Sequence, residues 1–205
     1  MLYIFDEIDL IEDDFLDDYK SLLSAERYEK MQRLRTPQKK KASAVAYLML
    51  RLALSELYGI NDAVEFVYED KGKPLLKSHP DIHFNLSHSK NAVTCVVSND
   101  KIGVDVQYIT HVKDSLAKRV LTDSEYARFK AFPTPDEYFC EIWTIKESYL
   151  KLIGKGITTD LRDIVADEIM EKMIYRHKDY YYCVCGSQVL IKHIRREDFE
   201  QLYTR

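Results

Sequence analysis

Residues 143–151 read Trp-Thr-Ile-Lys-Glu-Ser-Tyr-Leu-Lys, within a segment whose apolar spacing predicts a long helix. On a helix, Trp143, Glu147 and Lys151 are four residues apart, so they lie along one face, and Lys146 lies next to that face. A simpler interpretation is an exposed Glu147–Lys151 ion pair worth about 0.3–0.5 kcal/mol. The segment therefore indicates a function only if polar partners come from elsewhere in the chain.

A second polar feature is the expected strand 102–108, which reads Ile-Gly-Val-Asp-Val-Gln-Tyr. Side chains alternate along a strand, so Gly103, Asp105 and Gln107 share one face. Asp is depleted from strands, which makes an acid in this position unusual. The strand predicts either a functional face or one that is open to water.

The third polar feature follows an expected strand at 82–84 and reads Asn85-Leu86-Ser87-His88-Ser89. Its hydroxyls, imidazole and backbone N–H groups could bind an anion. In the simpler alternative, the segment is a loop whose Asn and Ser side chains bond to their own backbone.

Start and stop signals predict an α+β fold in which helices followed by hairpins occur twice, with a seam near residue 100. We therefore divide the chain into an N-terminal half, 1–100, and a C-terminal half, 101–205. The strand 92–97 is expected to pair with 102–108, and 180–184 with 188–191. Further elements are a strand at 2–5, a strand at 66–68, and helices capped by Ser24, Thr36 and Thr122, as well as helices at 114–120 and 137–153.

Composition narrows the class of protein. The 205 residues are 46% hydrophobic and 31% charged, as in a globular protein. A net charge of −4 argues against nucleic-acid binding, while the basic residues gathered in 26–41 suit a small anionic ligand or simply a solvated helix face. We expect no membrane span, no signal peptide, and four reduced cysteines in a cytoplasmic protein.

Together these segments resemble the 4′-phosphopantetheinyl transferase family, specifically its surfactin-synthetase-activating (Sfp) type. The resemblance runs over residues 27–157. It rests on the order and spacing of short motifs, namely Gly72-Lys73-Pro74, Phe84-Asn85-Leu86-Ser87-His88-Ser89, Ile102-Gly103-Val104-Asp105, Trp143-x-x-Lys146-Glu147-Ser148-x-x-Lys151 and Gly154-Lys155-Gly156.

The resemblance implies a holo-[acyl-carrier-protein] synthase activity. Such an enzyme moves 4′-phosphopantetheine from coenzyme A to a serine of an apo acyl or peptidyl carrier protein and releases 3′,5′-ADP. It also implies two similar α/β halves with the active site in the cleft between them, on a chain that acts as a monomer. The carrier could serve fatty-acid, polyketide or non-ribosomal peptide synthesis.

The residues suit this chemistry, because phosphoryl transfer needs positioning and charge neutralisation, usually with Mg²⁺. Asp105 and Glu147 can supply two carboxylates to Mg²⁺, and Glu147 is placed to take the serine proton. Lys151 can stabilise the diphosphate. The family's third metal ligand is an acid, but this sequence has Gln107 there. The resemblance assigns the binding of coenzyme A to Lys73, Ser87, His88, Arg27, Lys30, Lys41 and Lys151.

Two other classes remain open. A degenerate member could bind coenzyme A or a carrier without catalysis, which Gln107 favours and the presence of both Glu147 and Lys151 disfavours. A Mg²⁺-dependent phosphohydrolase could use Asp105 and Glu147, although basic residues spread over several segments suit a larger nucleotide.

Overall fold

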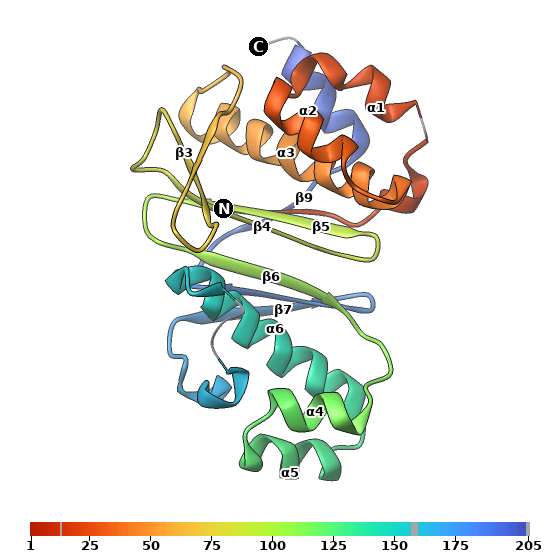
Figure 1. The fold of residues 1–205 in the computed structure, drawn as a ribbon, viewed down its shortest axis with the longest axis vertical. Helices are drawn as coiled ribbons and strands as arrows, with labels where there is room; N and C mark the ends of the chain where they lie inside the picture. Colours follow the sequence, from red (N-terminus) through yellow and green to blue (C-terminus); the bar gives the residue numbers. More distant parts are fainter. Residues whose placement is uncertain (13, 157–159, 204–205) are drawn as a thin grey trace.

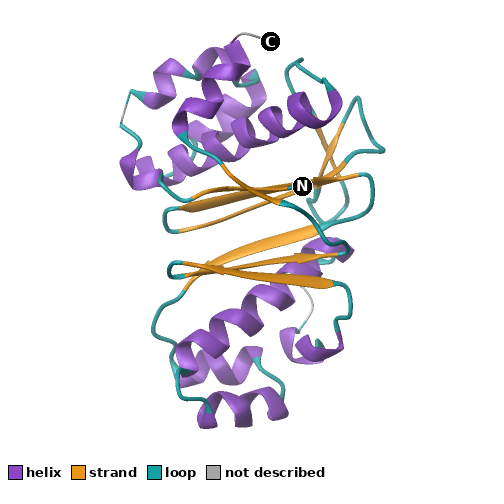
Figure 2. Ribbon diagram, turned by 180° about the vertical axis from the view of Figure 1, so that it is seen from behind, coloured by secondary structure: helices purple, strands orange, loops and turns teal. Residues whose placement is uncertain are grey.

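The computed structural model describes residues 1–12, 14–156 and 160–203. These residues form four layers, in which two β-sheets lie together at the centre and helices cover the outer face of each sheet (Figure 1). Figure 2 shows the same stack from behind, with the strands of both sheets between two groups of helices. The arrangement confirms the predicted α+β class with two similar halves.

The first half contains a four-stranded sheet, a two-stranded ribbon and three α-helices. These are β1 (Leu2–Phe5), α1 (Phe15–Asp18), α2 (Ala25–Gln32), α3 (Pro37–Tyr58), β2 (Phe66–Tyr68), β3 (Pro74–Leu76), β4 (His83–Ser89), β5 (Ala92–Ser98) and β9 (Ile191–His193). The sheet order is β4-β5-β1-β9, and β1 is antiparallel to β5 but parallel to β9. The long helix α3 and the sheet share one apolar core.

The second half contains a three-stranded sheet with the order β6-β8-β7. Its elements are β6 (Gly103–Tyr108), α4 (Asp114–Val120), α5 (Asp123–Ala131), α6 (Pro135–Ile153), the 3₁₀ turns η4 (Leu161–Asp163) and η5 (Ala166–Glu168), β7 (Lys172–His177) and β8 (Tyr180–Cys185). β8 is antiparallel to both neighbours. α6 packs on this sheet and shares a core with α4 and α5.

The helix boundaries follow the local sequence signals. The Thr36 side chain accepts a first-turn backbone N–H of α3, Pro37 occupies the first turn, and Gly59 ends the helix with φ of 67°. The predicted capping box is present at Thr122 and Glu125. Although α3 is long and buried, no helix within the described ranges combines the length and apolar character needed to cross a membrane.

Both predicted hairpins are wrong. β5 pairs with β4 and β1, whereas β6 lies in the other sheet beside β8. The strand after β8 is β9, and it pairs with β1 and not with β8. The hairpin partner of β8 is β7, which precedes it and which the sequence did not predict as a strand. An apolar strand can pair with several others, so its partner is decided only when distant segments pack together.

The polar segment expected to be a loop is in fact the main part of β4. β4 and β6 are edge strands of the two sheets. Three alternate side chains of β4 each accept a backbone N–H of β6, through Val104 N to Asn85 Oδ1 (3.1 Å), Val106 N to Ser87 Oγ (3.4 Å) and Tyr108 N to Ser89 Oγ (3.0 Å). Side chains of the first half thus accept hydrogen bonds from backbone N–H groups on the edge strand of the second half.

The end of the chain returns to the first half. β9 extends the first sheet, and the 3₁₀ helix η6 (Arg196–Tyr203) packs over α3. Phe199 is fully buried, with its ring 5.8 Å from that of Phe5 and 6.2 Å from that of Phe15. Residues 191–203 therefore lie with the half that sequence analysis ended at residue 100.

Candidate active site

Strand β6 and helix α6 approach each other closely at Gly103. A Cβ atom there would lie 2.2 Å from the backbone oxygen of Ser148 and 2.4 Å from the backbone nitrogen of Leu152, so only glycine fits. The Ser148 hydroxyl donates to the Gly103 carbonyl at 3.0 Å. This contact fixes the position of β6 along α6. It also brings Asp105, which lies two residues further along the same face of β6, toward the helix.

Asp105, Lys151 and Ser87 meet from three different elements. Asp105 is 6% exposed, and its Oδ1 accepts Lys151 Nζ at 2.7 Å and Ser87 Oγ at 2.6 Å. Ser87 Oγ also accepts Lys151 Nζ at 2.8 Å. The Ser87 hydroxyl, which sequence analysis assigned to coenzyme A, is therefore already bonded to two predicted catalytic groups.

Glu147 lies one helical turn before Lys151 and is 9% exposed. Its Oε1 and the Oδ2 of Asp105 are buried without a hydrogen-bond partner. Burial raises the pKa of Glu147, and the charge of Asp105 raises it further, while Lys151 lowers it. Two neighbouring carboxylates with unpartnered buried oxygens suit a cation.

The donor set fits Mg²⁺ in particular, because this ion is usually held by one or two carboxylates together with water and substrate phosphate. Asp105 and Glu147 would supply the two carboxylates. Within residues 1–12, 14–156 and 160–203, no three His, Cys, Asp or Glu side chains form a group that could hold a metal.

Gln107, the predicted third ligand, lies two residues after Asp105 on β6 and is half-buried. Its carbonyl accepts the Cys140 thiol at 3.5 Å. The residue also lines a pocket of about 110 Å³ whose apolar wall includes Phe139 and Trp143. Its role as a metal ligand stays a prediction.

Positive charge gathers around His88 on β4. The His88 side chain is exposed, yet the protein around it still desolvates the ring and lowers its pKa. The charges of Lys151, Lys39 and Arg27 lower this pKa further, while Asp105 raises it. These cations come from α6, α3 and α2, so both halves contribute. Lys39 belongs to the basic segment 26–41, but no motif in the sequence distinguishes it from the other cations there.

Arg27 is held at this place by the first turns of α3. Its Nη2 donates to the carbonyl and the hydroxyl of Ser43, both at 2.9 Å, and its Nε is buried without a partner. Burial lowers the pKa of Arg27. A half-buried guanidinium with an unpartnered N–H suits an anionic ligand.

Lys30 and Lys41, the other predicted ligands from the basic segment, contact protein groups. Lys30 Nζ lies 3.3 Å from the Tyr68 hydroxyl and 4.9 Å from the centre of its ring. Lys41 Nζ donates to the Ile11 carbonyl at 2.6 Å. Their assignment to coenzyme A stays a prediction.

Lys73 lies just before β3, and its side chain contacts α6 in the second half. Its Nζ donates to the carbonyls of Lys151 at 2.7 Å and Leu152 at 3.1 Å, which are at the C-terminal end of α6. Burial lowers the pKa of Lys73. A cation at a helix C-terminus satisfies free carbonyls and complements the helix dipole. This contact gives Lys73 a structural role beside its predicted one.

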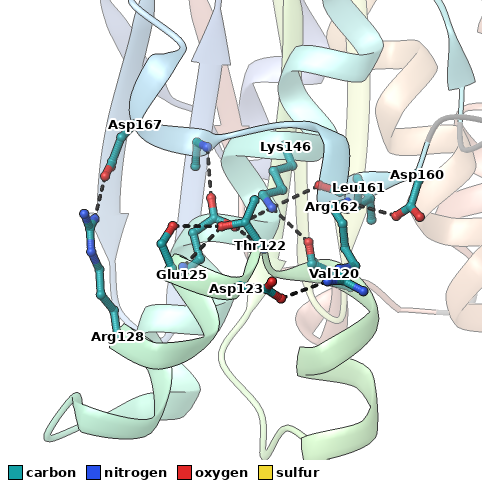
Figure 3. Close-up of polar contacts among 12 residues, drawn as sticks. Val120, Thr122, Asp123, Glu125, Arg128, Lys146, Asp160, Leu161, Arg162 and Asp167 are labelled. Atoms are coloured by element: carbon teal, nitrogen blue, oxygen red, sulfur yellow. Dashed lines mark hydrogen bonds and ion pairs between the residues drawn. The ribbon is translucent and has the colours of Figure 1, made fainter.

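Sequence analysis missed a buried ion pair behind the site. Lys146 is completely buried, and its Nζ lies 2.5 Å from Glu125 Oε2 (Figure 3). Glu125 was predicted only as part of a capping box, and Lys146 only as a neighbour of the Glu147 face. A lysine inside an otherwise apolar helix pattern was the available signal, but its partner on α5 lies 21 residues away in the sequence.

Two family models cover most of the chain. The model of the 4′-phosphopantetheinyl transferase superfamily matches residues 101–192, and the model of the N-terminal part of 4′-phosphopantetheinyl transferases matches residues 11–101. They meet at residue 101, where the chain passes from β5 to β6. The chain belongs to the 4′-phosphopantetheinyl transferase superfamily.

Curated relatives agree with this assignment. The chain is 33% identical to a Bacillus subtilis 4′-phosphopantetheinyl transferase over 68% of its own length and 63% of the relative's. For the 4′-phosphopantetheinyl transferase Sfp of Bacillus subtilis strain 168, identity is 30% over 70% and 65% of the two lengths. For the slr0495 protein of Synechocystis, it is 32% over 77% and 67%. The chain thus spans a little under two thirds of the two Bacillus relatives.

Proposed function

We propose that this chain transfers the 4′-phosphopantetheine group of coenzyme A to a serine hydroxyl of an apo carrier protein and releases 3′,5′-ADP. One observation carries the proposal. Two buried carboxylates with unpartnered oxygens, Asp105 and Glu147, lie beside Lys151 where the two halves meet. Membership of the superfamily supports the same activity.

The cations hold the anionic substrate in this proposal. Lys151 and Arg27 come from different halves, and both are close enough to lower the pKa of His88. A nucleotide with a diphosphate and a further phosphate presents several anionic groups that such separated cations can bind at once. Substrate binding would therefore span the junction of the halves.

The carboxylates serve the reacting phosphate. Asp105 and Glu147 would hold Mg²⁺, which when bound neutralises charge on the diphosphate. Glu147 is the proposed acceptor for the serine proton, because burial and the charge of Asp105 raise its pKa. Lys151 bonds to Asp105 through one oxygen only, which leaves the other carboxylate oxygen available.

Gln107 makes the protein's own metal site weaker than one with three acids. A neutral amide is a poorer ligand for Mg²⁺ than a carboxylate. We therefore propose that Mg²⁺ binds the free protein weakly and binds far more tightly with coenzyme A, and that Mg²⁺ tightens coenzyme A by the same factor.

We also propose the cellular location, the oligomeric state and the substrate class of the protein. All four cysteines, which lie in the described ranges, are free and buried, which is consistent with a reducing cytoplasm. We propose that the chain acts as a monomer, since both halves contribute to the site. The substrate class is an acyl or peptidyl carrier protein.

The first test is to incubate the protein with coenzyme A, Mg²⁺ and a panel of apo carrier proteins, and then weigh the intact carriers. A phosphopantetheine mass gain supports transfer. Release of 3′,5′-ADP without a change in the carriers would instead support a hydrolase. Binding of coenzyme A with neither product would support a module that only binds.

The carboxylates give a sharper test. Asp105→Ala and Glu147→Ala should each lower kcat about 100-fold or more, since each loses several kcal/mol of charge stabilisation. Both should keep a cooperative thermal unfolding transition. Asp123→Ala, on an exposed carboxylate of α5, is the matched control and should transfer like wild type. Near-normal turnover in either site variant would remove that acid from the mechanism.

A further inference from the structure

Lys146 has all its hydrogen-bonding capacity used inside the protein. An ammonium group has three donors. Lys146 Nζ contacts Glu125 Oε2 at 2.5 Å, the Val120 carbonyl at 2.8 Å and the Leu161 carbonyl at 3.0 Å (Figure 3). These acceptors lie on α5, at the end of α4 and in η4, so one side chain of α6 connects three other segments.

Glu125 extends the same connection. Its Oε2 also accepts the Thr122 backbone N–H at 2.9 Å, and its Oε1 accepts the Ala166 backbone N–H of η5 at 2.9 Å. The carboxylate is almost completely buried. The Lys146–Glu125 pair therefore fixes α6 to the start of α5 and to the 3₁₀ turns η4 and η5.

The pair acts on the side of α6 that faces away from β6. Consecutive helical residues are about 100° apart around the axis. Lys146 points into the helical layer, while the next residue, Glu147, lies beside Asp105. On the strand side, Ser148 contacts Gly103. The rotation of α6, and with it the direction of Glu147 and Lys151, is thus held from both sides.

We propose that Lys146 and Glu125 are positioning residues for the reaction, which fix the rotation of α6 so that Glu147 and Lys151 meet Asp105 and the substrate. The inference rests on the proposed function. Stability alone is a weaker explanation, because apolar residues of similar volume often replace a buried ion pair at no loss of stability. A misplacement of catalytic groups by about 1 Å can cost about 100-fold in rate.

The test compares Lys146→Met with wild type in two measurements. Amide hydrogen exchange of peptides covering residues 140–153 measures how firmly α6 is fixed, and it does not depend on enzyme activity. Steady-state kinetics should show kcat reduced about 100-fold, with the KM for coenzyme A changed less than about 3-fold. The KM for coenzyme A should change little, because Arg27 and His88, which are proposed to bind coenzyme A, lie in the other half.

Two controls separate positioning from general stability. Leu48→Ala removes packing from the fully buried core of the first half and should lower Tm without changing exchange in α6 or kcat. Arg162→Met removes the exposed Arg162–Asp123 pair beside the buried one (Figure 3) and should leave Tm, exchange and kcat at wild-type values.

A second variant covers the case in which Lys146→Met does not fold. Glu125→Gln keeps one acceptor oxygen at the end of the side chain and replaces the other oxygen by an NH₂ group, which cannot accept a hydrogen bond. It should raise exchange in α6 and lower kcat about 10-fold, again more than it changes KM.

Each outcome decides the inference. Faster exchange in α6 together with a loss of kcat that the Leu48→Ala control lacks supports it. If α6 exchange is unchanged, or if kcat stays within 3-fold of that control, Lys146 is only structural and the inference is wrong. If wild type modifies no carrier, the proposed function fails, and unchanged or increased exchange still decides whether Lys146 holds α6.

Discussion

At the scale of single residues, Glu147 combines a proposed functional role with a cost in stability when it is ionised. Burial and Asp105 raise its pKa in the folded protein. A raised folded pKa means that the native state binds the proton more tightly than the unfolded state does. The contribution of Glu147 to stability is therefore full below its unfolded pKa, about 4.3, and is lost as the pH rises through the folded pKa.

Glu147→Gln should consequently raise Tm relative to wild type at pH 8, and the difference should shrink toward zero as the pH falls to 4. Calorimetric melts at several pH values measure this without any substrate. Glu171→Gln, which changes an exposed carboxylate, should show no such trend. A lower Tm for Glu147→Gln at pH 8 would mean that the ionised carboxylate is stabilised in the free protein.

At the scale of elements, the contact of β6 with α6 depends on the missing side chain of Gly103. Gly103→Ala should destabilise the protein by about 3 kcal/mol, because its Cβ would meet two backbone atoms of α6 that cannot move independently. It should also reduce transfer, since Asp105 and Lys151 would separate. Urea unfolding and the carrier mass assay measure the two effects.

The matched control for that substitution is Gly59→Ala. A Cβ at Gly59 would meet nothing within 4 Å, so only its positive φ of 67° opposes the change. It should cost about 1 kcal/mol and leave transfer intact. Equal losses in the two variants would show that β6 and α6 tolerate a wider separation than the close contact implies.

At the scale of the whole molecule, the first half depends on the end of the chain. β9 covers β1, and Phe199 and Leu202 belong to the first core. A fragment of residues 1–100, the proposed N-terminal half, should therefore not unfold cooperatively by calorimetry or circular dichroism. Adding residues 189–205 through a flexible linker should restore a transition. Cooperative unfolding of the fragment alone would contradict this.

Local signals predicted the helices well because each cap is a contact within one turn, as at Thr36 and Thr122. Strand pairing was predicted poorly, since the sequence of β5 favours a strand but does not say that β1 and β4, instead of β6, lie beside it. The same limit explains the polar side chains of β4. Their bonds run to the backbone of another sheet, which no local pattern describes.

The sequence by itself determined which groups are candidates for the reaction: an acid in a strand, an acid and a lysine one turn apart on a helix, and a basic segment. Spacing along one element is set by covalent geometry, so Glu147 and Lys151 had to lie on one side of α6. Only the tertiary structure decided that Ser87 and Lys151 share Asp105, and that Lys146 pairs with Glu125. Those contacts join segments far apart in the chain, and they form only when two sheets and their helices pack together and exclude water from the charges between them.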